Sequence, residues 1–413
     1  MNIKNRLIVM NFMEFFVWGS WLISLGGYMI VTLKFSGGQV GSIYATMGVA
    51  SLFMPALLGI VADRWVNAER VLGMCHIING ILLFVASMVT EYSTMYVIML
   101  LNSMFYMPTI ALNNAVSYRV LEKYDLEIVK IFPPIRMWGT VGFVVAMWVV
   151  DLAGWSVSPM QLYVSSAAAI ILGIYSFTMP ACLPAEKKVN PTFMQSLGLD
   201  ALVLFKKKKM AIFFVFAMLL GASLQITNTF GEAFLHDFGP LYPDSFAVKY
   251  PGIMMSISQI SETLFILTIP FFLIRFGIQK VMIMSIFAWV FRFALFGIGN
   301  PGDGVVYLIA SMIIYGLAFD FFNISGSLFV KQEADSNMVA SAQGIFMLMT
   351  NGIGAFLGGT LSGMVVDHFT VAGIKNWPNI WYTFAAYSLI LGIAFPLVFK
   401  YKHEPKAVQV VAH

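Results

Sequence analysis

The chain has 413 residues, of which 59% are hydrophobic and only 11% are charged. Soluble proteins are about 25% charged, so this composition excludes a water-soluble fold. A helix that crosses a bilayer needs about 20 apolar residues, and the apolar content is enough for about twelve such helices joined by short loops. Loops that short leave no room for an appended catalytic domain, so an enzyme is not expected. The net charge of +4 does not indicate binding to nucleic acid. In a membrane protein, the distribution of Lys and Arg between the two sides of the bilayer indicates the orientation of the chain instead.

Hydropathy along the chain predicts an all-α polytopic membrane protein with twelve transmembrane helices in two sets of six. The predicted spans cover residues 7–33, 38–61, 71–90, 95–117, 134–154, 159–181, 210–235, 250–274, 281–299, 305–330, 338–366 and 379–399. Between the sets lies the longest polar stretch, which ends in the run Lys206–Lys209. We therefore predict an N-terminal six-helix half (1–183), a linker (184–209), a C-terminal six-helix half (210–400) and a tail (401–413).

The basic residues predict the orientation in the membrane. Most of the 24 Lys and Arg residues fall on one side if the linker and both termini are cytoplasmic, as the positive-inside rule requires. Two six-helix halves with both ends inside resemble the major facilitator fold. The stretch GIVADRWVNAER places Gly59, Asp63 and Arg64 as in a cytoplasmic loop of that superfamily, although Val66 stands where a second glycine is expected. This likeness implies a cytoplasmic latch between the halves, and the alternative is an exposed turn with topology charges.

Five ionisable residues lie inside predicted spans, namely Glu14, Arg136, Glu262, Arg292 and Asp320. Each costs about 2.5–3.5 kcal/mol to insert, so packing alone would not hold them unless they were paired or lined a wet cavity. We therefore predict a central polar cavity between the two halves. Arg292, in the apolar run AWVFRFALF, is expected to be a structural partner and is left out of the site.

Polar and aromatic residues recur at helical spacing on one face of several spans. These faces carry Arg136, Thr140 and Phe143; Gln225 and Asn228; Gln259 and Glu262; and Tyr315, Phe319 and Phe322, with Asp320 and Asn323 beside them. Amide, guanidinium and carboxylate groups can match base edges and sugar hydroxyls, and aromatic rings can stack on a base. The pattern suits a nucleoside, but a sugar needs the same hydroxyl partners, so both stay open. Ordinary packing or an interhelical hydrogen bond is the alternative for any one of these residues.

Glycines are concentrated in the eleventh predicted span. They are Gly352, Gly354, Gly358, Gly359 and Gly363. Small residues at spacings of four let helix backbones approach closely, so we expect this span to pack tightly against its neighbours.

Several stretches resemble a known family. They read FVWGSW, FMPALLGIVADRW, FPPIRMWGTVGF, LQITN, SQISETLFILTIPFF and FDFFNISGS. On these stretches the chain resembles, from about Trp18 to Lys402, the nucleoside:proton symporter family of the major facilitator superfamily. The resemblance implies a proton-coupled nucleoside importer of a bacterial inner membrane that alternates access around a midplane pocket. The partners implied are a nucleoside such as uridine, adenosine or xanthosine, a proton and membrane lipids, with no nucleic acid, cofactor or metal.

The same resemblance implies which residues form the site. The substrate pocket of the family is attributed to residues that match Arg136, Thr140, Phe143, Gln225, Asn228, Gln259, Glu262, Tyr315 and Phe319. The carboxylate that matches Asp320 is tied to proton coupling, and its aromatic neighbours favour the protonated form. Some members carry Gln at the position of Glu14, which makes Glu14 a second candidate for the proton.

Within this site we expect a division between base and ribose. Base edges need paired donors and acceptors, which Arg136, Gln225 and Asn228 offer. Gln259 and Glu262 are expected to hold the ribose hydroxyls, with the neighbouring hydroxyls in the run SET as further hydrogen-bond partners of Glu262. The alternative functions are a proton-coupled or facilitative sugar porter and a membrane receptor or scaffold that transports nothing.

Overall fold

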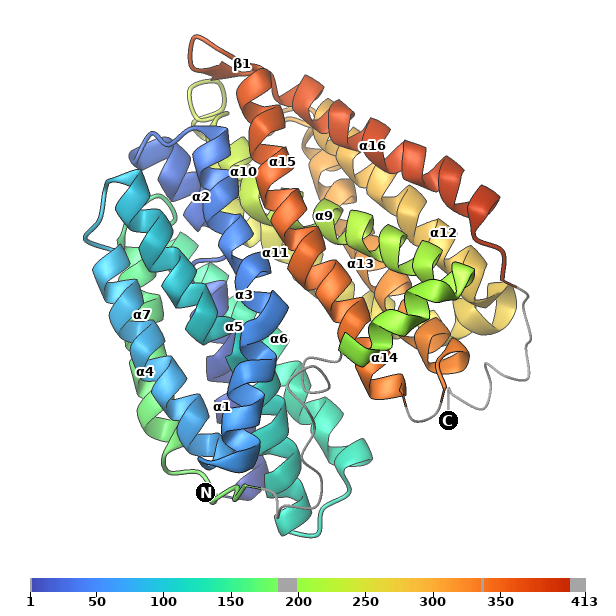
Figure 1. Ribbon diagram of the computed structural model, residues 1–413. Coiled ribbons are helices and arrows are strands. Elements are labelled where there is room, and N and C mark those ends of the chain that lie inside the picture. Colours follow the sequence, from blue (N-terminus) through green and yellow to red (C-terminus); the bar gives the residue numbers. More distant parts are fainter. Residues whose placement is uncertain (1, 185–198, 336–337, 402–413) are drawn as a thin grey trace.

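The chain folds into two groups of helices that lie side by side (Figure 1). The first group, here called the N-terminal half, consists of α1 (Ile3–Gly19), α2 (Leu25–Gly27), η1 (Tyr28–Thr32), α3 (Gly37–Arg64), α4 (Ala68–Ala86), α5 (Tyr92–Lys123), α6 (Ile128–Leu152) and α7 (Met160–Ser176). The second, the C-terminal half, consists of η2 (Leu199–Lys206), α9 (Lys208–His236), α10 (Phe246–Lys249), α11 (Pro251–Ile266), α12 (Ile269–Ile298), α13 (Val305–Glu333), α14 (Val339–Met347), η3 (Leu348–Gly354), α15 (Ala355–His368), β1 (Thr370–Val371), β2 (Ile374–Lys375) and α16 (Trp377–Val398). This computed structural model describes residues 2–184, 199–335 and 338–401.

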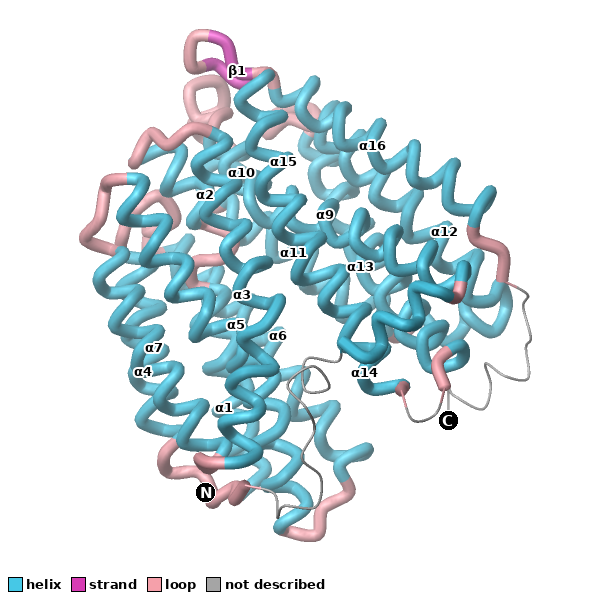
Figure 2. Tube along the Cα trace, in the orientation of Figure 1, coloured by secondary structure: helices cyan, strands magenta, loops and turns pink. Residues whose placement is uncertain are grey.

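Helices account for nearly all of the described chain, and the short hairpin of β1 and β2 is its strand pair (Figure 2). Among the described residues, nine helices are long and apolar enough to cross a membrane. The shorter helices α1, α7 and α11 occupy the other predicted span positions, which is consistent with twelve spans. Large apolar side chains such as Ile171, Ile174, Leu264 and Leu397 are exposed, as lipid-facing residues are in a membrane protein.

Two predicted spans are interrupted in ways that hydropathy does not reveal. The first breaks after Gly19 into a turn, the short helix α2 and the π-helix η1. The eighth predicted span, residues 250–274, covers α11 and the start of α12, because the helix breaks between Ile266 and Ile269. The loop that was expected after this span is only a kink inside α12. Gly277 makes this kink with φ 78° and ψ 166°, a conformation that favours glycine because a Cβ would clash. The predicted linker is described from η2 onward, while residues 185–198 of it and residues 402–413 of the tail lie outside the described residues.

Helix α15 joins the two halves through small residues, as its glycine content predicts. It packs between α3 of the N-terminal half and α9 of its own half. A Cβ on Gly359 would lie 2.7 Å from the carbonyl oxygen of Gly41, and a Cβ on Gly358 would lie 2.5 Å from the carbonyl oxygen of Ala222. Side chains at these two positions would push the helices apart, so glycine permits the close approach.

Hydrogen bonds between the halves gather at the end of the molecule that carries α2 and the β-hairpin, here called the hairpin end (Figure 1). Asp367 at the end of α15 accepts hydrogen bonds from the backbone N–H groups of Gly37 and Gly38 at 2.6 and 2.7 Å. These donors are unpaired at the start of any helix, so the carboxylate caps α3 from the other half. Trp148 of α6 donates to the hydroxyl of Ser256 in α11 at 2.9 Å. The halves are therefore tied together at this end.

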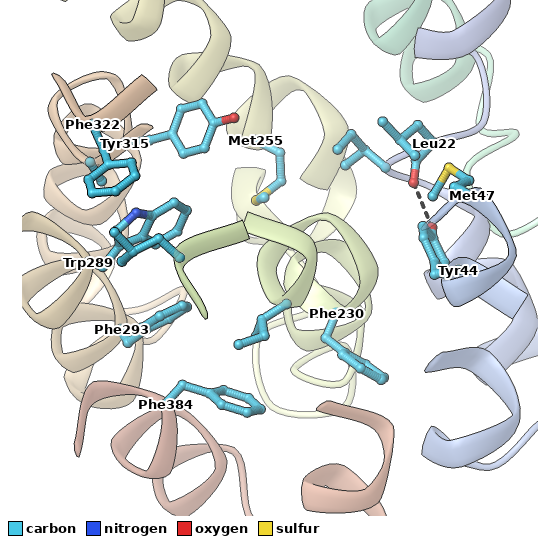
Figure 3. Close-up of a cluster of buried hydrophobic side chains, with 14 of the residues drawn as sticks. Leu22, Tyr44, Met47, Phe230, Met255, Trp289, Phe293, Tyr315, Phe322 and Phe384 are labelled. Atoms are coloured by element: carbon cyan, nitrogen blue, oxygen red, sulfur yellow. Dashed lines mark hydrogen bonds between the residues drawn. The ribbon is translucent and has the colours of Figure 1, made fainter. Parts of the chain in front are cut away.

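Aromatic rings fill the core of the C-terminal half (Figure 3). Trp289 and Phe293 of α12 stack at 5.5 Å, and Phe293 stacks in turn on Trp381 of α16 at 6.1 Å. Tyr315 of α13 meets Trp289 edge-on at 6.1 Å. Pairs like these add about 0.5–1.5 kcal/mol each beyond the area that they bury, so they hold α12, α13 and α16 in a fixed arrangement.

Candidate functional site

The N-terminal half contributes a wall made of a guanidinium and aromatic rings. Arg136 on α6 lies over the ring of Phe15 on α1 with its Cζ atom 4.0 Å from the ring centroid. Thr140 lies one turn further along α6 and is half-buried. Phe143 lies two turns further along, and its ring meets that of Trp18 edge-on at 6.1 Å. Helical spacing puts these three α6 residues on one face, as predicted from the sequence.

The opposite wall comes from α13 of the C-terminal half. The rings of Tyr315 and Phe319 stack at 6.0 Å with an interplanar angle of 7°. The next residue, Asp320, is only 4% exposed, and its Oδ2 atom has no hydrogen-bond partner among the described residues. A buried polar atom without a partner costs free energy, about 1–3 kcal/mol for a neutral group and more for a charged one, so its presence needs an explanation.

Helix α9 supplies the predicted amides. Gln225 is buried with its Nε2 atom unpaired among the described residues, and Asn228, one turn on, is half-buried. The helix comes close to η3 at Gly221, where an added Cβ would meet the backbone of Thr350. Gln225 lies about one turn of α9 beyond this contact.

Helix α11 supplies Gln259 and Glu262, both half-buried. Electrostatic interactions connect Glu262 with Arg136 of the other half and with Asp320 of its own half. The expectation that neighbouring hydroxyls serve Glu262 is wrong. Ser261 donates instead to the carbonyl oxygen of Ile313, and Thr263 donates to the carbonyl oxygen of Gln259 at 3.2 Å. Hydroxyls in a helix bond readily to the preceding turn or to a neighbouring helix, and these two take that option.

A cavity lies between α9, α12, α13 and η3. Its aromatic lining is Trp289, Phe319 and Phe322, and its polar lining is Asn323, Thr350 and Asn351. Its mostly apolar wall with a few polar groups is typical of the lining of small-molecule sites. Of these residues the sequence argument placed Phe319 and Phe322 on one face of their helix, with Asn323 beside it, and assigned only Phe319 to the site. Thr350 and Asn351 escaped because they lie in a π-helical segment, where the spacing used to find faces does not apply.

Glu14 has a partner that sequence reasoning missed. His76 of α4 lies with its Nε2 atom 2.8 Å from Glu14 Oε2, and both side chains are fully buried. Thr109 donates to Glu14 Oε1 at 2.6 Å, and Tyr106 donates to the Glu14 backbone carbonyl at 2.8 Å. Arg136 also interacts electrostatically with Glu14. The two members of the pair are 62 residues apart, so no local pattern could have found them.

Two further charged groups from the sequence argument have defined neighbours. Arg292 is buried, donates to the carbonyl oxygen of Ser311 at 2.9 Å and lies 4.6 Å over the ring of Tyr315. It packs against the side of α13 that carries Tyr315.

Asp63 of the predicted latch pairs with Arg119 of α5 at 2.6 Å. Both belong to the N-terminal half, so a latch between the halves stays a prediction, as does the part of Gly59 and Arg64 in it.

The chain matches one known protein family over almost its whole length. Residues 1–404 match the family described as Nucleoside H+ symporter. The chain belongs to the nucleoside:proton symporter family. It is 53% identical over 418 residues to the nucleoside permease NupG of Escherichia coli (strain K12), with 100% of both chains covered. It is 54% identical over 412 residues to the xanthosine permease of the same organism, with 99% of both chains covered.

Solved structures show the same fold. A crystal structure of the nucleoside transporter NupG superposes with a TM-score of 0.92 at 54% identity, covering 97% of this chain and 100% of that chain. A bacterial homolog of the human lysosomal transporter Spinster superposes with a TM-score of 0.70 at 14% identity, covering 98% of this chain and 96% of that one, which shows the fold alone. This symporter is therefore an all-α membrane transporter of the major facilitator type and not an enzyme, as the composition predicts.

Proposed function

We propose that this symporter imports nucleosides by binding them between its two halves, beside the α13 wall of Tyr315, Phe319 and Asp320. The observation that carries the proposal is a pair of buried, unpaired polar atoms, Gln225 Nε2 and Asp320 Oδ2, next to a cavity with an aromatic wall. Leu224 lines that cavity directly before Gln225 in the sequence. A nucleoside offers acceptors on its base, donors on its ribose and a flat face for stacking, which together meet these groups.

The base and the ribose would use different walls. Arg136 lies over the ring of Phe15 and offers guanidinium N–H groups for hydrogen bonds to base acceptors, with Gln225 and Asn228 on α9 of the other half as further partners. Glu262 receives no hydrogen bond from its neighbouring hydroxyls, so its carboxylate oxygens are available to accept from ribose hydroxyls. We keep Gln259, on the same helix, as its neighbour at the ribose. Thr140, Phe143, Tyr315 and Phe319 complete the pocket.

Proton coupling is assigned to Asp320. A nucleoside carries no net charge, so accumulation requires a co-transported ion, worth about 2.3 kcal/mol per charge for each 100 mV of membrane potential. Asp320 is buried and interacts electrostatically with Glu262, so two negative charges would repel each other there. Protonation of Asp320 removes that repulsion and lets Glu262 serve the ribose as a carboxylate. In this way proton binding and nucleoside binding support each other.

The positions of the basic residues suggest which way the pocket opens. If Lys206–Lys209 and both termini face the cytoplasm of a bacterial inner membrane, the hairpin end faces the periplasm. The interhalf hydrogen bonds then close the periplasmic side, and the described conformation is the inward-facing one. Alternating access would occur by rocking of the N-terminal and C-terminal halves about the pocket.

Uptake of labelled uridine and xanthosine into vesicles with an imposed pH gradient tests this proposal. We expect accumulation when the outside is acidic, and no accumulation of a labelled sugar. Removing one partner of a buried hydrogen bond costs about 1–3 kcal/mol, so Gln225→Ala should weaken nucleoside binding about 5- to 150-fold. Asp320→Asn should abolish accumulation but retain nucleoside exchange. Asp244→Asn, at an exposed carboxylate paired with Lys249, is the matched control and should behave as the parent.

Three results would overturn parts of the proposal. Nucleoside binding by Gln225→Ala with the parent's affinity would remove Gln225 from the pocket. Full pH-driven accumulation by Asp320→Asn would move the proton to Glu14 or Glu262. Accumulation of a sugar without nucleoside competition would replace the substrate class.

A further inference from the structure

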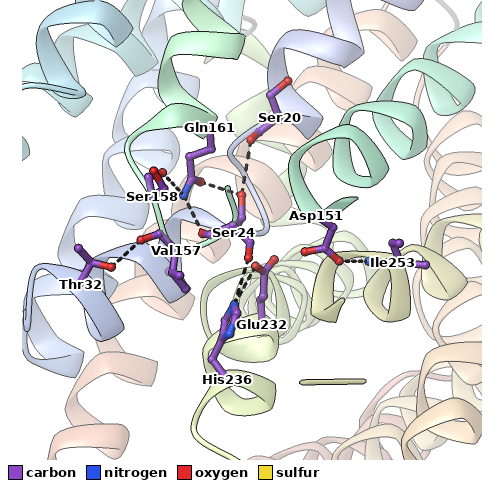
Figure 4. A network of polar contacts seen from close by, with 12 residues as sticks. Ser20, Ser24, Thr32, Asp151, Val157, Ser158, Gln161, Glu232, His236 and Ile253 are labelled. Carbon is purple, nitrogen blue, oxygen red and sulfur yellow. Dashed lines mark hydrogen bonds and ion pairs between the residues drawn. The ribbon is translucent and has the colours of Figure 1, made fainter. Parts of the chain in front are cut away.

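Two buried carboxylates from opposite halves meet at the hairpin end, on the same helices α6 and α9 that carry pocket residues (Figure 4). Asp151 lies near the end of α6 and Glu232 near the end of α9, and they are 2% and 1% exposed. Both line a small cavity together with Ser24, Gly252 and apolar side chains, and this cavity is too narrow for a water molecule. Oδ1 of Asp151 and Oε2 of Glu232 have no hydrogen-bond partner among the described residues.

The groups around this pair do not neutralise two negative charges. In the described part of the chain neither carboxylate forms an ion pair with a Lys or Arg. His236, one turn along α9, lies 3.4 Å from Glu232 Oε1 and equally far from the Ser156 hydroxyl of the other half. Tyr44 of α3 interacts with Glu232 but donates its hydroxyl hydrogen to the carbonyl oxygen of Leu22. The nearby Lys375 is already paired with Asp237 at 2.9 Å.

We propose that Asp151 and Glu232 form a second proton-binding site, which holds the hairpin end closed when it is protonated. Two carboxylates in one dry cavity repel each other, and one added proton removes a charge and supplies the O–H donor that an unpaired oxygen lacks. A proton fits the available space, whereas a hydrated metal cation does not. The site is separate from Asp320 and does not depend on the assignment of the transported proton.

The local contacts indicate where the proton resides. Oδ2 of Asp151 accepts a hydrogen bond from the backbone N–H of Ile253 at 2.7 Å, in the first turn of α11. Unpaired N–H groups and the positive end of the helix dipole stabilise an anion at that position. Asp151 is therefore the better anion, and the proton belongs on the side of Glu232 and His236.

The position of the pair between the halves gives the site its function. Asp151 belongs to the N-terminal half and Glu232 to the C-terminal half, so they share a cavity only while the hairpin end is closed. When this end opens, the carboxylates separate and become hydrated, and the reason to keep the proton disappears. A group that binds a proton more tightly in one state shifts the equilibrium toward that state as the pH falls. Acid therefore favours the closed hairpin end, and rising pH favours its opening.

Distances between spin labels on the two halves measure this equilibrium. Met88, in the loop between α4 and α5, and Val371, in the β-hairpin, are both exposed at the hairpin end and can be replaced by cysteine for labelling. The native Cys75 and Cys182 are buried and stay unlabelled. For the full-length protein we expect the closed-to-open ratio to fall by up to tenfold per pH unit across the titration, the limit for release of one proton.

Variants show which group carries this dependence. Glu232→Gln and Asp151→Asn should each remove it and leave the hairpin end closed at every pH, because either change removes the repulsion. His236→Asn should keep a pH dependence. Asp244→Asn, at an exposed carboxylate, should retain the parent's profile. If Glu232→Gln does not fold, Asp151→Asn provides the same test.

Four outcomes would overturn the proposal. The first is a closed-to-open ratio that does not change with pH in the parent. The second is the parent's profile in both Glu232→Gln and Asp151→Asn. The third is loss of the profile in His236→Asn but not in these two variants, and the fourth is its loss in the control Asp244→Asn. Replacing choline chloride by sodium chloride at constant pH and ionic strength is the last arm. A sodium-dependent ratio that Glu232→Gln abolishes would make the ligand a metal cation, whereas no effect of sodium supports the proton.

Discussion

Replacing Gly359 by alanine would test the contact that brings the two halves together. Gly359 lies in α15, where the backbone of α3 from the other half passes directly against it. The added Cβ would lie 2.7 Å from the carbonyl oxygen of Gly41 and 2.9 Å from the backbone nitrogen of Ala45. Both neighbours are backbone atoms of a helix, so neither can rotate away as the tip of a side chain can.

The size of the effect follows from these distances. Ordinary carbon contacts begin at about 3.5 Å, so α3 and α15 would have to separate by roughly 0.7 Å or more. Overpacking of this kind costs about 1–3 kcal/mol. The gain in helix propensity from glycine to alanine, about 1 kcal/mol, offsets part of it. We therefore expect a net destabilisation of up to about 2 kcal/mol, directed at the state in which these helices touch.

The Tm of the purified protein in detergent and the spin-label distance across the hairpin end measure the result. We expect Gly359→Ala to lower the Tm by a few degrees and to increase the open population at the hairpin end. Gly344→Ala is the matched control, because Gly344 is also helical and an added Cβ there meets nothing within 4 Å. It should leave the Tm unchanged or raise it slightly. Equal Tm values and distances for the two variants would refute the packing argument.

Three other outcomes follow from the structure. Glu262→Gln should weaken the binding of uridine more than that of 2′,3′-dideoxyuridine in a competition assay, and an equal loss for both would remove Glu262 from the ribose. His76→Ala should lower thermal stability more than His76→Gln, because it leaves the fully buried carboxylate of Glu14 without its partner at 2.8 Å. Breaking a buried pair costs about 3–5 kcal/mol. Equal Tm values for the two variants would contradict this prediction. Hydrogen bonds from Ser93 and Thr94 lower the pKa of the exposed Glu91 to about 2 from an ordinary 4.5, so this helix cap stabilises the fold above pH 4.5 and its contribution is lost as the pH falls toward 2. The Tm gap between Glu91→Gln and the parent should therefore be present at neutral pH and close in acid.

Local patterns in the sequence identified much of the candidate site. Arg136, Thr140 and Phe143 share a face of α6 because a continuous α-helix repeats every 3.6 residues, and hydropathy alone placed that helix. The same reasoning failed at Thr350 and Asn351, since η3 departs from that period. It also failed for the hydroxyls beside Glu262. A serine or threonine in a helix can bond to its own helix, to a neighbouring one or to a side chain, and spacing does not distinguish these options.

The sequence by itself determined the membrane class, the apolar helices and the presence of charges too costly to insert without a function. Those properties depend on composition and on interactions between residues a few positions apart, which any reader of the chain can see. Only the tertiary structure decided which charges meet. Glu14 faces His76, Asp151 and Glu232 share a cavity, and Asp367 caps α3 from the opposite half. Each pairing depends on how helices distant in sequence pack against one another, and that packing is set by all of their side chains together.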